Sequence, residues 1–326
     1  MRRPLRFVSR RRLVGGATAL VVALAGCRSP HEPDPRYRPA ENVLEVIAVL
    51  RRHVPDDTYR FEPAHDFTGK NVYRASLVRI ENLERIHGDA LRSGNLEDVI
   101  AFAKGRALER LRAFELAAAS YRRAAARGDA LRREALRSAA LCDGLAEAAE
   151  IGFDADRPTQ AAPPVPASTG QEIAAYDSRV ALLEALADEV RDTHYAAVVR
   201  EEIERADVLR ARYATYTRRT TPDGNVFAVS QWQRVSLQHR ESKNANRHLL
   251  ELADLYETLA REYVEAHPPE GLGFDPASFS ELADATVRVY EMVARQDGTA
   301  ERIEASRRLE AFLSFTLTID RDRFSH

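Results

Sequence analysis

The chain has 326 residues, which is enough for one large domain or two ordinary domains with a hydrophobic core. About a third of the residues are charged, but the formal net charge is only −2, so there is no basic excess of the kind expected for a nucleic-acid partner. The two cysteines, Cys27 and Cys142, form no cluster that would indicate zinc or an iron–sulfur centre, and no C-x-x-C-H motif indicates haem. We therefore predict no metal and no cofactor.

Residues 1–26 have the organisation of a bacterial export signal. Six arginines accompany a stretch of small and apolar residues from Leu13 to Ala25, which is shorter than the roughly 20 residues that a membrane-spanning helix needs. The stretch closes on Leu24-Ala25-Gly26-Cys27, which resembles the lipobox of bacterial lipoproteins. The resemblance implies cleavage before Cys27 and a diacylglyceryl group on its thiol. The alternative is an uncleaved membrane anchor in which the cysteine occurs by chance.

Processing at this position changes the charge of the protein and suggests where it resides. Loss of residues 1–26 removes six arginines, so the formal charge goes from −2 to −8. Ser9-Arg10-Arg11-Arg12-Leu13-Val14 resembles a twin-arginine export signal, and whether this route or the general one is used stays open. Arg28 follows Cys27, and by resemblance to the sorting rule of Gram-negative lipoproteins this favours the outer membrane. We expect a lipoprotein that is anchored through Cys27 and faces the periplasm.

A spacer and a first helical domain follow the anchor. Residues 27–40 contain four prolines, which predict a tether that does not fold. Helical periodicity over 41–153 predicts the N-terminal helical domain. Its expected helices cover residues 41–53, 70–92, 96–110, 113–127 and 131–149, with a less regular stretch at 55–68 and Asn95 as a cap.

A second low-complexity segment precedes the C-terminal helical domain. The Pro/Ala-rich linker 154–170 either divides the chain into two helical halves or loops out between two of their helices. Over 171–326 we expect helices at 171–218 (one helix, or two joined near Thr193), 227–266, 277–296 and 299–314. Thr221-Pro222-Asp223-Gly224 predicts a turn. The alternation in 315–319 is typical of a strand, here expected as a frayed or docked end.

Cys142 lies in an Ala-rich helical segment. It has no partner for an intramolecular disulfide once Cys27 is lipidated. We interpret it as a small buried hydrophobic residue, with an intermolecular disulfide as the alternative.

One internal motif indicates a repeat. Its spacing, G-x2-L-x8-A-x3-Y-x2-A, resembles that of a tetratricopeptide repeat (TPR), a helix pair of 34 residues. The motif consists of Gly105, Leu108, Ala117, Tyr121 and Ala124. Small residues at 105 and 117 let two antiparallel helices approach closely, and Tyr121 fills the groove toward the next helix. Ala139, 34 residues after Gly105, is expected in the first helix of the next unit.

The motif departs from the family in two ways. Asp129 stands where a proline is expected, and Gly128 supplies the break instead. The following unit runs into the Pro-rich linker, and only fainter echoes occur at Leu259, Tyr263 and Ala266. The alternative interpretation is an Ala-rich helical hairpin without a regular repeat.

Motifs of common enzymes are missing. No H-E-x-x-H, G-x-S-x-G, Walker-type loop or Gly-rich dinucleotide turn occurs. His248 and Glu251 could enter a carboxylate-bridged metal site, but no second Glu-x-x-His element accompanies them, so we expect a solvated face. Glu241-Ser242 resembles the Glu-Ser pair of lytic transglycosylases, but the companion Gly-x-Met-Gln element is absent.

Two further features allow a structural and a functional interpretation. The acidic run of Glu201, Glu202 and Glu204 is interpreted as a solvated helix face with charge pairing along the helix. Trp232 is interpreted as a cap on a helical core, with a binding hot spot as the alternative.

Together these patterns predict an all-α fold of antiparallel helix pairs that form a TPR-like or irregular helical solenoid. The expected function is that of a non-catalytic scaffold, held at a membrane by its lipid, which binds a protein partner of the cell envelope along a helical groove. Two other functions stay open: an accessory component of transport or envelope assembly that holds a small ligand, and a peptidoglycan-active enzyme without a local motif. No nucleic-acid partner is expected and no catalytic residue is assigned.

Overall fold

A computed structural model describes residues 39–57, 64–94, 96–153 and 168–323. Within these ranges the chain is all-α. The helices are α2 (Pro39–Asp57), α3 (Val72–Ser93), α4 (Glu97–Arg110), α5 (Phe114–Arg127), α6 (Arg132–Glu150), α7 (Thr169–Val190), α8 (Ala196–Thr217), α9 (Gly224–Gln238), α10 (Ala245–Ala266), α11 (Pro276–Ala294) and α12 (Ala300–Arg323). The predictions for the signal peptide, Cys27, the tether up to residue 38 and Asn95 lie outside the described residues.

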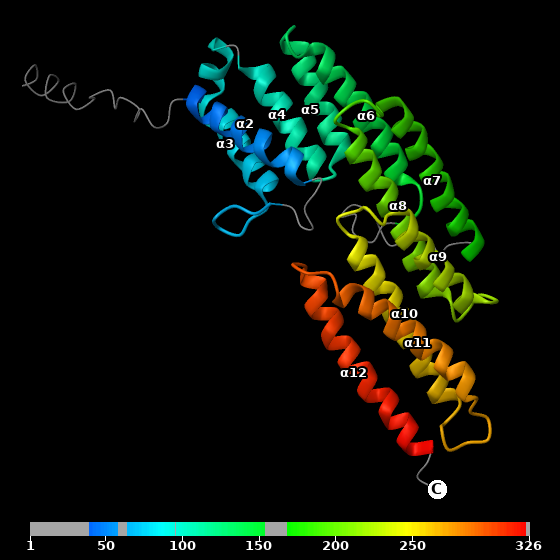
Figure 1. Cartoon of the computed structure of the whole chain (residues 1–326). Coiled ribbons are helices and arrows are strands. Elements are labelled where there is room, and N and C mark those ends of the chain that lie inside the picture. Colours follow the sequence, from blue (N-terminus) through cyan, green and yellow to red (C-terminus); the bar gives the residue numbers. More distant parts are fainter. Residues whose placement is uncertain (1–38, 58–63, 95, 154–167, 324–326) are drawn as a thin grey trace, which may run out of the picture.

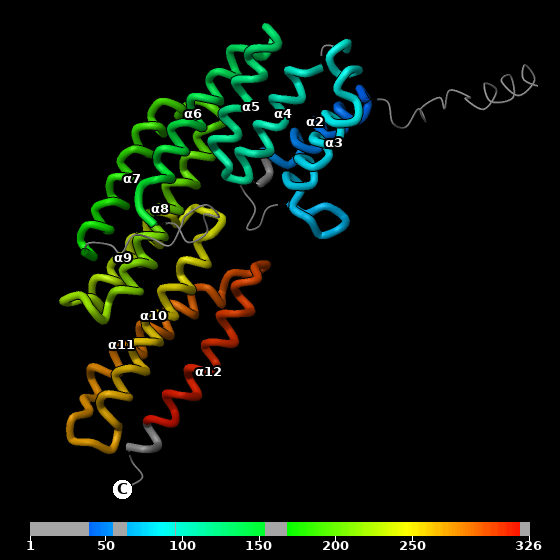
Figure 2. The backbone as a smooth tube through the Cα atoms, turned by 180° about the vertical axis from the view of Figure 1, so that it is seen from behind, coloured from blue at the N-terminus to red at the C-terminus, as the bar shows by residue number. Residues whose placement is uncertain are grey.

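The helices follow one another as a curved row (Figure 1). Helices that are adjacent in sequence pack against each other along the row, and α2 also contacts α4, as α10 contacts α12. Seen from behind, α2 and α3 lie at one end of the row and α12 at the other (Figure 2). This arrangement of successive helix pairs confirms the predicted fold class, an all-α helical solenoid.

Local sequence signals define several helix starts. The Asn71 side chain accepts hydrogen bonds from the backbone N–H groups of Tyr73 and Arg74, at 2.9 and 3.2 Å, and so caps α3. Asp275 caps α11 in the same way, and Pro276 occupies the first position of that helix, where no N–H donor is needed.

The structure shows two helices in each of two long helical segments, of which the first is predicted as one helix or as two joined near Thr193. The segment 171–218 forms two helices that meet at residues 191–195, where the Thr193 N–H donates to the carbonyl of Val190 at 2.9 Å. The prediction of one helix over 227–266 is wrong, because α9 ends at Gln238 and α10 begins at Ala245. The intervening residues form hydrogen-bonded turns, and Ser242 among them donates a hydrogen bond to Glu204 of α8. These contacts stabilise the break between the two helices, although helical periodicity continues on either side of it.

The C-terminal tail is helical, so its interpretation as a strand is wrong. Helix α12 continues through residues 315–319 to Arg323. Phe312 and Ile319 are seven residues apart and both are buried, and the Phe315 ring contacts Phe279 at 6.3 Å between centroids. Apolar residues therefore repeat with the period of a helix, and this contact with α11 decides the conformation.

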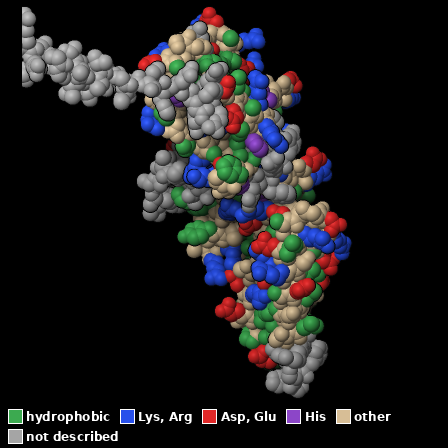
Figure 3. Space-filling model, turned by 90° about the vertical axis from the view of Figure 1, so that its left-hand side faces the viewer, with side chains coloured by type: hydrophobic (Ala, Val, Ile, Leu, Met, Phe, Trp, Pro, Cys, Tyr) green, Lys and Arg blue, Asp and Glu red, His purple; other side chains and the backbone are tan. Residues whose placement is uncertain are grey.

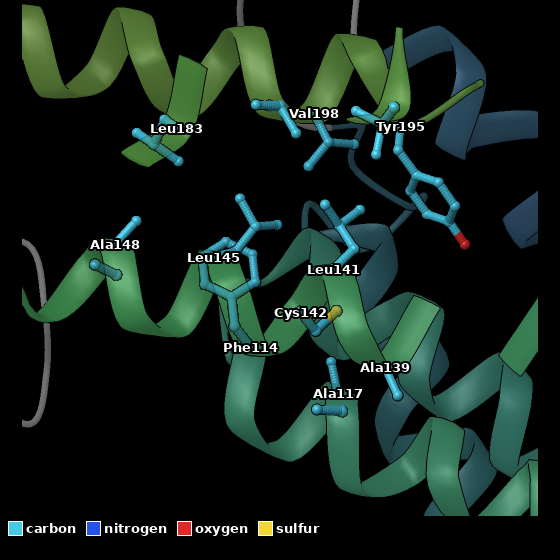
Figure 4. Close-up of a cluster of buried hydrophobic side chains, with 14 of the residues drawn as sticks. Phe114, Ala117, Ala139, Leu141, Cys142, Leu145, Ala148, Leu183, Tyr195 and Val198 are labelled. Atoms are coloured by element: carbon cyan, nitrogen blue, oxygen red, sulfur yellow. The ribbon is translucent and has the colours of Figure 1, made fainter. Parts of the chain in front are cut away.

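One hydrophobic core joins the helices that precede and follow the Pro/Ala-rich linker. One cluster of buried side chains contains Leu145 of α6 together with Leu183 of α7 and Val198 of α8. Figure 4 shows Leu183 and Val198 facing Leu145 and Leu141 across this interface. The helices on the two sides of residues 154–167 therefore share one hydrophobic core. Cys142 belongs to the same cluster and is fully buried, as its interpretation as a small hydrophobic residue predicted.

The residues of the TPR-like motif form the contact between α4 and α5. Gly105 on α4 faces Tyr121 on α5, and Ala117 and Ala124 lie buried on the same face of α5 as the tyrosine. Leu108 is also buried, and Ala139 is buried on α6 at the next interface. These residues serve helix packing.

Candidate functional site

Three adjoining cavities lie along α8, from its N-terminus to Arg212. Their volumes are about 620, 710 and 480 Å³. The first two share Ala197 and Arg200 as lining residues, and the second and third share Glu201, Glu204 and Lys243. We call the three together the α8 groove.

The walls of the α8 groove come from helices far apart in sequence. Val54 of α2 and Arg106 of α4 line the first cavity, and Arg247 of α10 lines the third. Figures 1 and 2 place the turn between α9 and α10 on the inner side of the curved row. Figure 3 shows this side of the molecule, where Lys and Arg side chains lie among Asp, Glu and hydrophobic side chains. The groove therefore lies where the N-terminal and C-terminal helices meet.

Glu204 is the most strongly bonded carboxylate of the groove. It accepts hydrogen bonds from Ser242 Oγ at 2.6 Å, His248 Nε2 at 2.7 Å and Asn244 Nδ2 at 3.0 Å. Burial by itself would raise the pKa of Glu204, but these hydrogen bonds lower it to about 2. The carboxylate is therefore ionised at neutral pH and ties the α9–α10 turn and the start of α10 to α8.

Asp207 lies one turn further along α8 and is also buried. It pairs with Nε2 of His239 at 2.9 Å, where α9 ends, and with Arg210 at 3.3 Å. Arg234 on α9 approaches the same carboxylate at 3.7 Å. Both ends of the α9–α10 turn are thus held by carboxylates of α8, three residues apart on one helix face.

Glu202 links α8 to the corner between α4 and α5. Arg112 donates to both carboxylate oxygens of Glu202, from Nε at 2.6 Å and from Nη2 at 2.7 Å, and Arg179 of α7 approaches at 3.7 Å. Arg112 has a left-handed backbone conformation with φ of 60°, which a non-glycine residue adopts at a cost. A bidentate arginine–carboxylate pair with the buried Glu202 offsets that cost.

Glu201 lies on the floor of the second and third cavities. Lys243 Nζ donates to it at 2.9 Å, and Arg110 approaches at 3.6 Å. Burial raises the pKa of Glu201, because removal from water disfavours the charged form more than the two cations favour it. Glu201 is therefore less firmly ionised than Glu204.

Arg106 connects the TPR-like helix pair to the start of α8. Its guanidinium lies 3.3 Å from Glu109, 3.1 Å from His194 Nε2 and 3.4 Å from the Tyr195 hydroxyl. The Tyr121 hydroxyl donates to Glu109 at 2.7 Å. Arg106 and Glu109 line the first cavity, and the buried Tyr121 hydroxyl supports this wall from behind through Glu109.

A fourth cavity, of about 620 Å³, lies between α9 and α10 near their other ends. Val226, Val229 and Leu259 line it, and its carboxylate, Glu262, is paired with Arg218 at 2.5 Å. Polar side chains from several helices converge in the α8 groove and not in this apolar cavity, so the α8 groove is the candidate site.

Two predictions about polar residues of the groove are wrong. Glu202 and Glu204 are buried and form contacts between helices, so the acidic run is not a solvated face. The prediction of a solvated face for His248 is also wrong, since its ring is buried against Glu204. Trp232 is buried, with its Nε1 donating to Thr215 Oγ1 at 3.0 Å, as expected for a core residue. Glu241 projects into solvent at the edge of the second cavity.

The acidic residues of α8 carry a sequence signal for this site. Glu202 lies well apart from Glu204 and Asp207 around α8, so no single solvated face can hold all of these carboxylates. Acidic residues spread so widely around a helix indicate that neighbouring helices cover some of them. The histidines that follow, His239 and His248, supply partners on the next two helices.

Within the described ranges, no helix combines the length and the apolar composition needed to cross a membrane. Among the same residues, no group of three or more His, Cys, Asp or Glu side chains is placed to hold a metal ion. No protein-family model matches the sequence, and no curated protein shows significant similarity to it.

Proposed function

We propose that this protein is a lipid-anchored, non-catalytic scaffold of the bacterial cell envelope, and that it binds an extended segment of a protein partner in the α8 groove. The observation that carries the proposal is that three neighbouring cavities share lining residues along one helix, with walls from α2, α4, α7, α8, α9 and α10. A helical solenoid characteristically binds extended ligands on such an inner surface.

The walls of the groove support binding without rearrangement. Glu202, Glu204 and Asp207 are buried and each holds a side chain from another helix. These contacts fix the relative positions of α4, α8 and α10 before any partner arrives. A preformed surface loses little conformational entropy on binding, which favours affinity.

The anchor is proposed from the sequence of residues 1–27. Cleavage before Cys27 and attachment of a lipid to its thiol would hold the chain at a membrane surface, with the groove available to envelope proteins. The preference for the outer membrane rests on Arg28. Growth with a radiolabelled fatty acid tests the anchor, because label should appear in the wild-type chain and be lost in Cys27→Ser.

Site-specific photocrosslinking in cells tests the scaffold role. A photoreactive amino acid at Gln238, which is exposed and lines the second cavity, is expected to give one adduct of defined mass. The control places the same group at Glu147 on α6, which is exposed but lines none of the cavities described above. The adduct should be absent from the control and reduced in the Cys27→Ser background. Absence of any adduct from groove positions would reject the scaffold and favour a small-ligand role.

A further inference from the structure

Helix α12 carries apolar side chains on two different sides. Phe312 and Ile319 are buried on the side that packs mainly against α11. Ile303, Leu313 and Leu317 lie on another side, and we call these three residues the outer strip. Ile303 is 75% exposed and Leu317 is 69% exposed. At about 100° per residue, the middle of the outer strip lies roughly 140° around the helix from the buried side.

An exposed apolar strip is unusual on the last helix of a solenoid. Figures 1 and 2 show α12 at the end of the row, and the described part of the chain has no further helix beyond it. Terminal units of solenoids ordinarily present a polar outer face, because no repeat follows to cover an apolar one. A helix inside the row needs apolar residues on two sides, since it has a neighbour on each. Helix α12 therefore has the residue pattern of an interior helix at a terminal position.

The charges beside the outer strip are complementary to themselves. Arg307 and Glu310 are exposed on this side of α12, and neither forms an ion pair with another described residue. When two copies of a helix pack antiparallel about a two-fold axis, residue i of one copy meets residue j of the other, and j meets i. An axis midway between these two residues places each Arg307 opposite the partner's Glu310. The same register brings each Leu317 within one helical turn of the partner's Ile303.

From this pattern we infer that two copies of the chain dimerise through α12. The two helices pack antiparallel, bury their outer strips against each other and pair Arg307 with the partner's Glu310. Ser306 and Ser314 lie within or beside the strip, and their small side chains let the two helix axes approach closely. The inference goes beyond the proposed function, because it uses neither the α8 groove nor the lipid anchor.

The size of the strip sets the strength of the dimer. Helix α12 has 24 residues and is therefore about 36 Å long. A contact along one helix of that length stays below the roughly 800 Å² per partner that stable complexes bury. We therefore expect a reversible dimer with a dissociation constant in the micromolar range. Such a dimer joins two α8 grooves in one particle, so a partner with two matching segments gains avidity.

Sedimentation equilibrium of the full chain in a density-matched detergent tests the inference. The wild-type protein should show a monomer–dimer equilibrium. Leu317→Ser should raise the dissociation constant by about tenfold or more, because the symmetric interface loses two buried apolar side chains. Leu272→Ser is the matched control, since Leu272 is also a fully exposed leucine but lies in the loop between α10 and α11.

Charge exchange tests the pairing of the two helices. Arg307→Glu and Glu310→Arg should each weaken self-association by about tenfold or more, because like charges then meet twice across the axis. An equal mixture of the two variants should recover the dimer, since opposite charges then meet at both positions. The chain that carries both substitutions should recover it for the same reason. Arg288→Glu, at an exposed position of α11, should leave the dissociation constant unchanged.

Three outcomes would overturn the inference. The first is a wild-type chain that stays monomeric at the highest soluble concentration. The second is a dimer that Leu317→Ser and the charge variants leave unchanged, because its contact then lies elsewhere. The third comes from a photoreactive amino acid in place of Leu317 in cells, which should give an adduct of twice the chain mass. An adduct of any other mass would show that a different protein covers the outer strip.

Discussion

The ring of Tyr121 occupies the space that a side chain at position 105 would need. A Cβ atom placed on Gly105 would lie 2.7 Å from ring carbons of Tyr121, well inside van der Waals contact. The absence of a side chain at 105 thus sets how closely α4 and α5 approach. This contact is the physical reason why the TPR-like motif has a small residue at position 105 and a tyrosine at position 121.

Gly105→Ala is therefore expected to destabilise the protein. Overpacking of a core position costs about 1–3 kcal/mol, of which the better helix propensity of alanine recovers up to about 1 kcal/mol. The control is Gly88→Ala in α3, where the nearest side-chain atom, of Arg92, is 3.6 Å from the added Cβ. Urea unfolding followed by circular dichroism should show a lower midpoint for Gly105→Ala only. Equal midpoints for the two variants would mean that α5 can shift to accept the methyl group.

Acid should weaken the contact between α8 and the α9–α10 turn. The pKa of Glu204 is about 2 in the folded protein, below its ordinary value of 4.5. Its stabilising contribution is thus complete above about pH 4.5 and is lost as the pH falls toward 2. In Glu204→Gln, the free energy of unfolding at pH 7 should drop by roughly 2 kcal/mol, and its dependence on pH between 4.5 and 2 should flatten. Glu241→Gln, at an exposed position, should retain the wild-type profile.

Arg112 combines an unfavourable backbone conformation with a favourable ion pair, and substitutions separate the two. Arg112→Ala should cost roughly 2–4 kcal/mol, because Glu202 stays buried without its bidentate partner. Arg112→Gly loses the same pair but adopts the positive φ freely, so it should be about 1 kcal/mol more stable than the alanine variant. Thermal unfolding of the two variants measures the difference. An alanine variant at least as stable as the glycine variant would contradict a backbone cost at this corner.

Cys142 should resist thiol reagents in the folded protein. The thiol is fully buried, and burial raises its pKa well above the ordinary value, so little reactive thiolate forms. At pH 8 we expect no maleimide adduct on Cys142 within minutes, and complete modification once the chain is unfolded in guanidinium chloride. Intact mass spectrometry checks both. Rapid modification under native conditions would show that α6 opens locally.

Hydrophobic periodicity was sufficient to predict most helices and their approximate bounds. It failed where a tertiary contact competes with local pattern. The tail 315–319 alternates like a strand, yet Phe312 and Ile319 bury it as a helix. The break between α9 and α10 lies inside a continuous periodic pattern, because Ser242 and Asn244 gain more from Glu204 than from helix continuation.

The α8 groove could not be predicted from the sequence in the same way. Its carboxylates resemble those of any charged surface helix until their distant partners are known. Arg112 is 90 residues from Glu202 in sequence, and His248 is 44 residues from Glu204. Only the curvature of the helix row brings such residues together, and curvature follows from packing at every interface along the chain.

Helix α8 belongs to two hydrophobic clusters at once. Val198, Val199 and Ala206 belong to the cluster shared with α6 and α7, and Ala211 and Ala214 to the cluster shared with α9 and α10. Solenoids of weakly coupled repeats can unravel stepwise from either end, because each repeat depends only on its neighbours. Here, the loss of either cluster removes the support of the same helix. The middle of this protein is therefore expected to melt as one cooperative unit, with fraying confined to α2–α3 and α12.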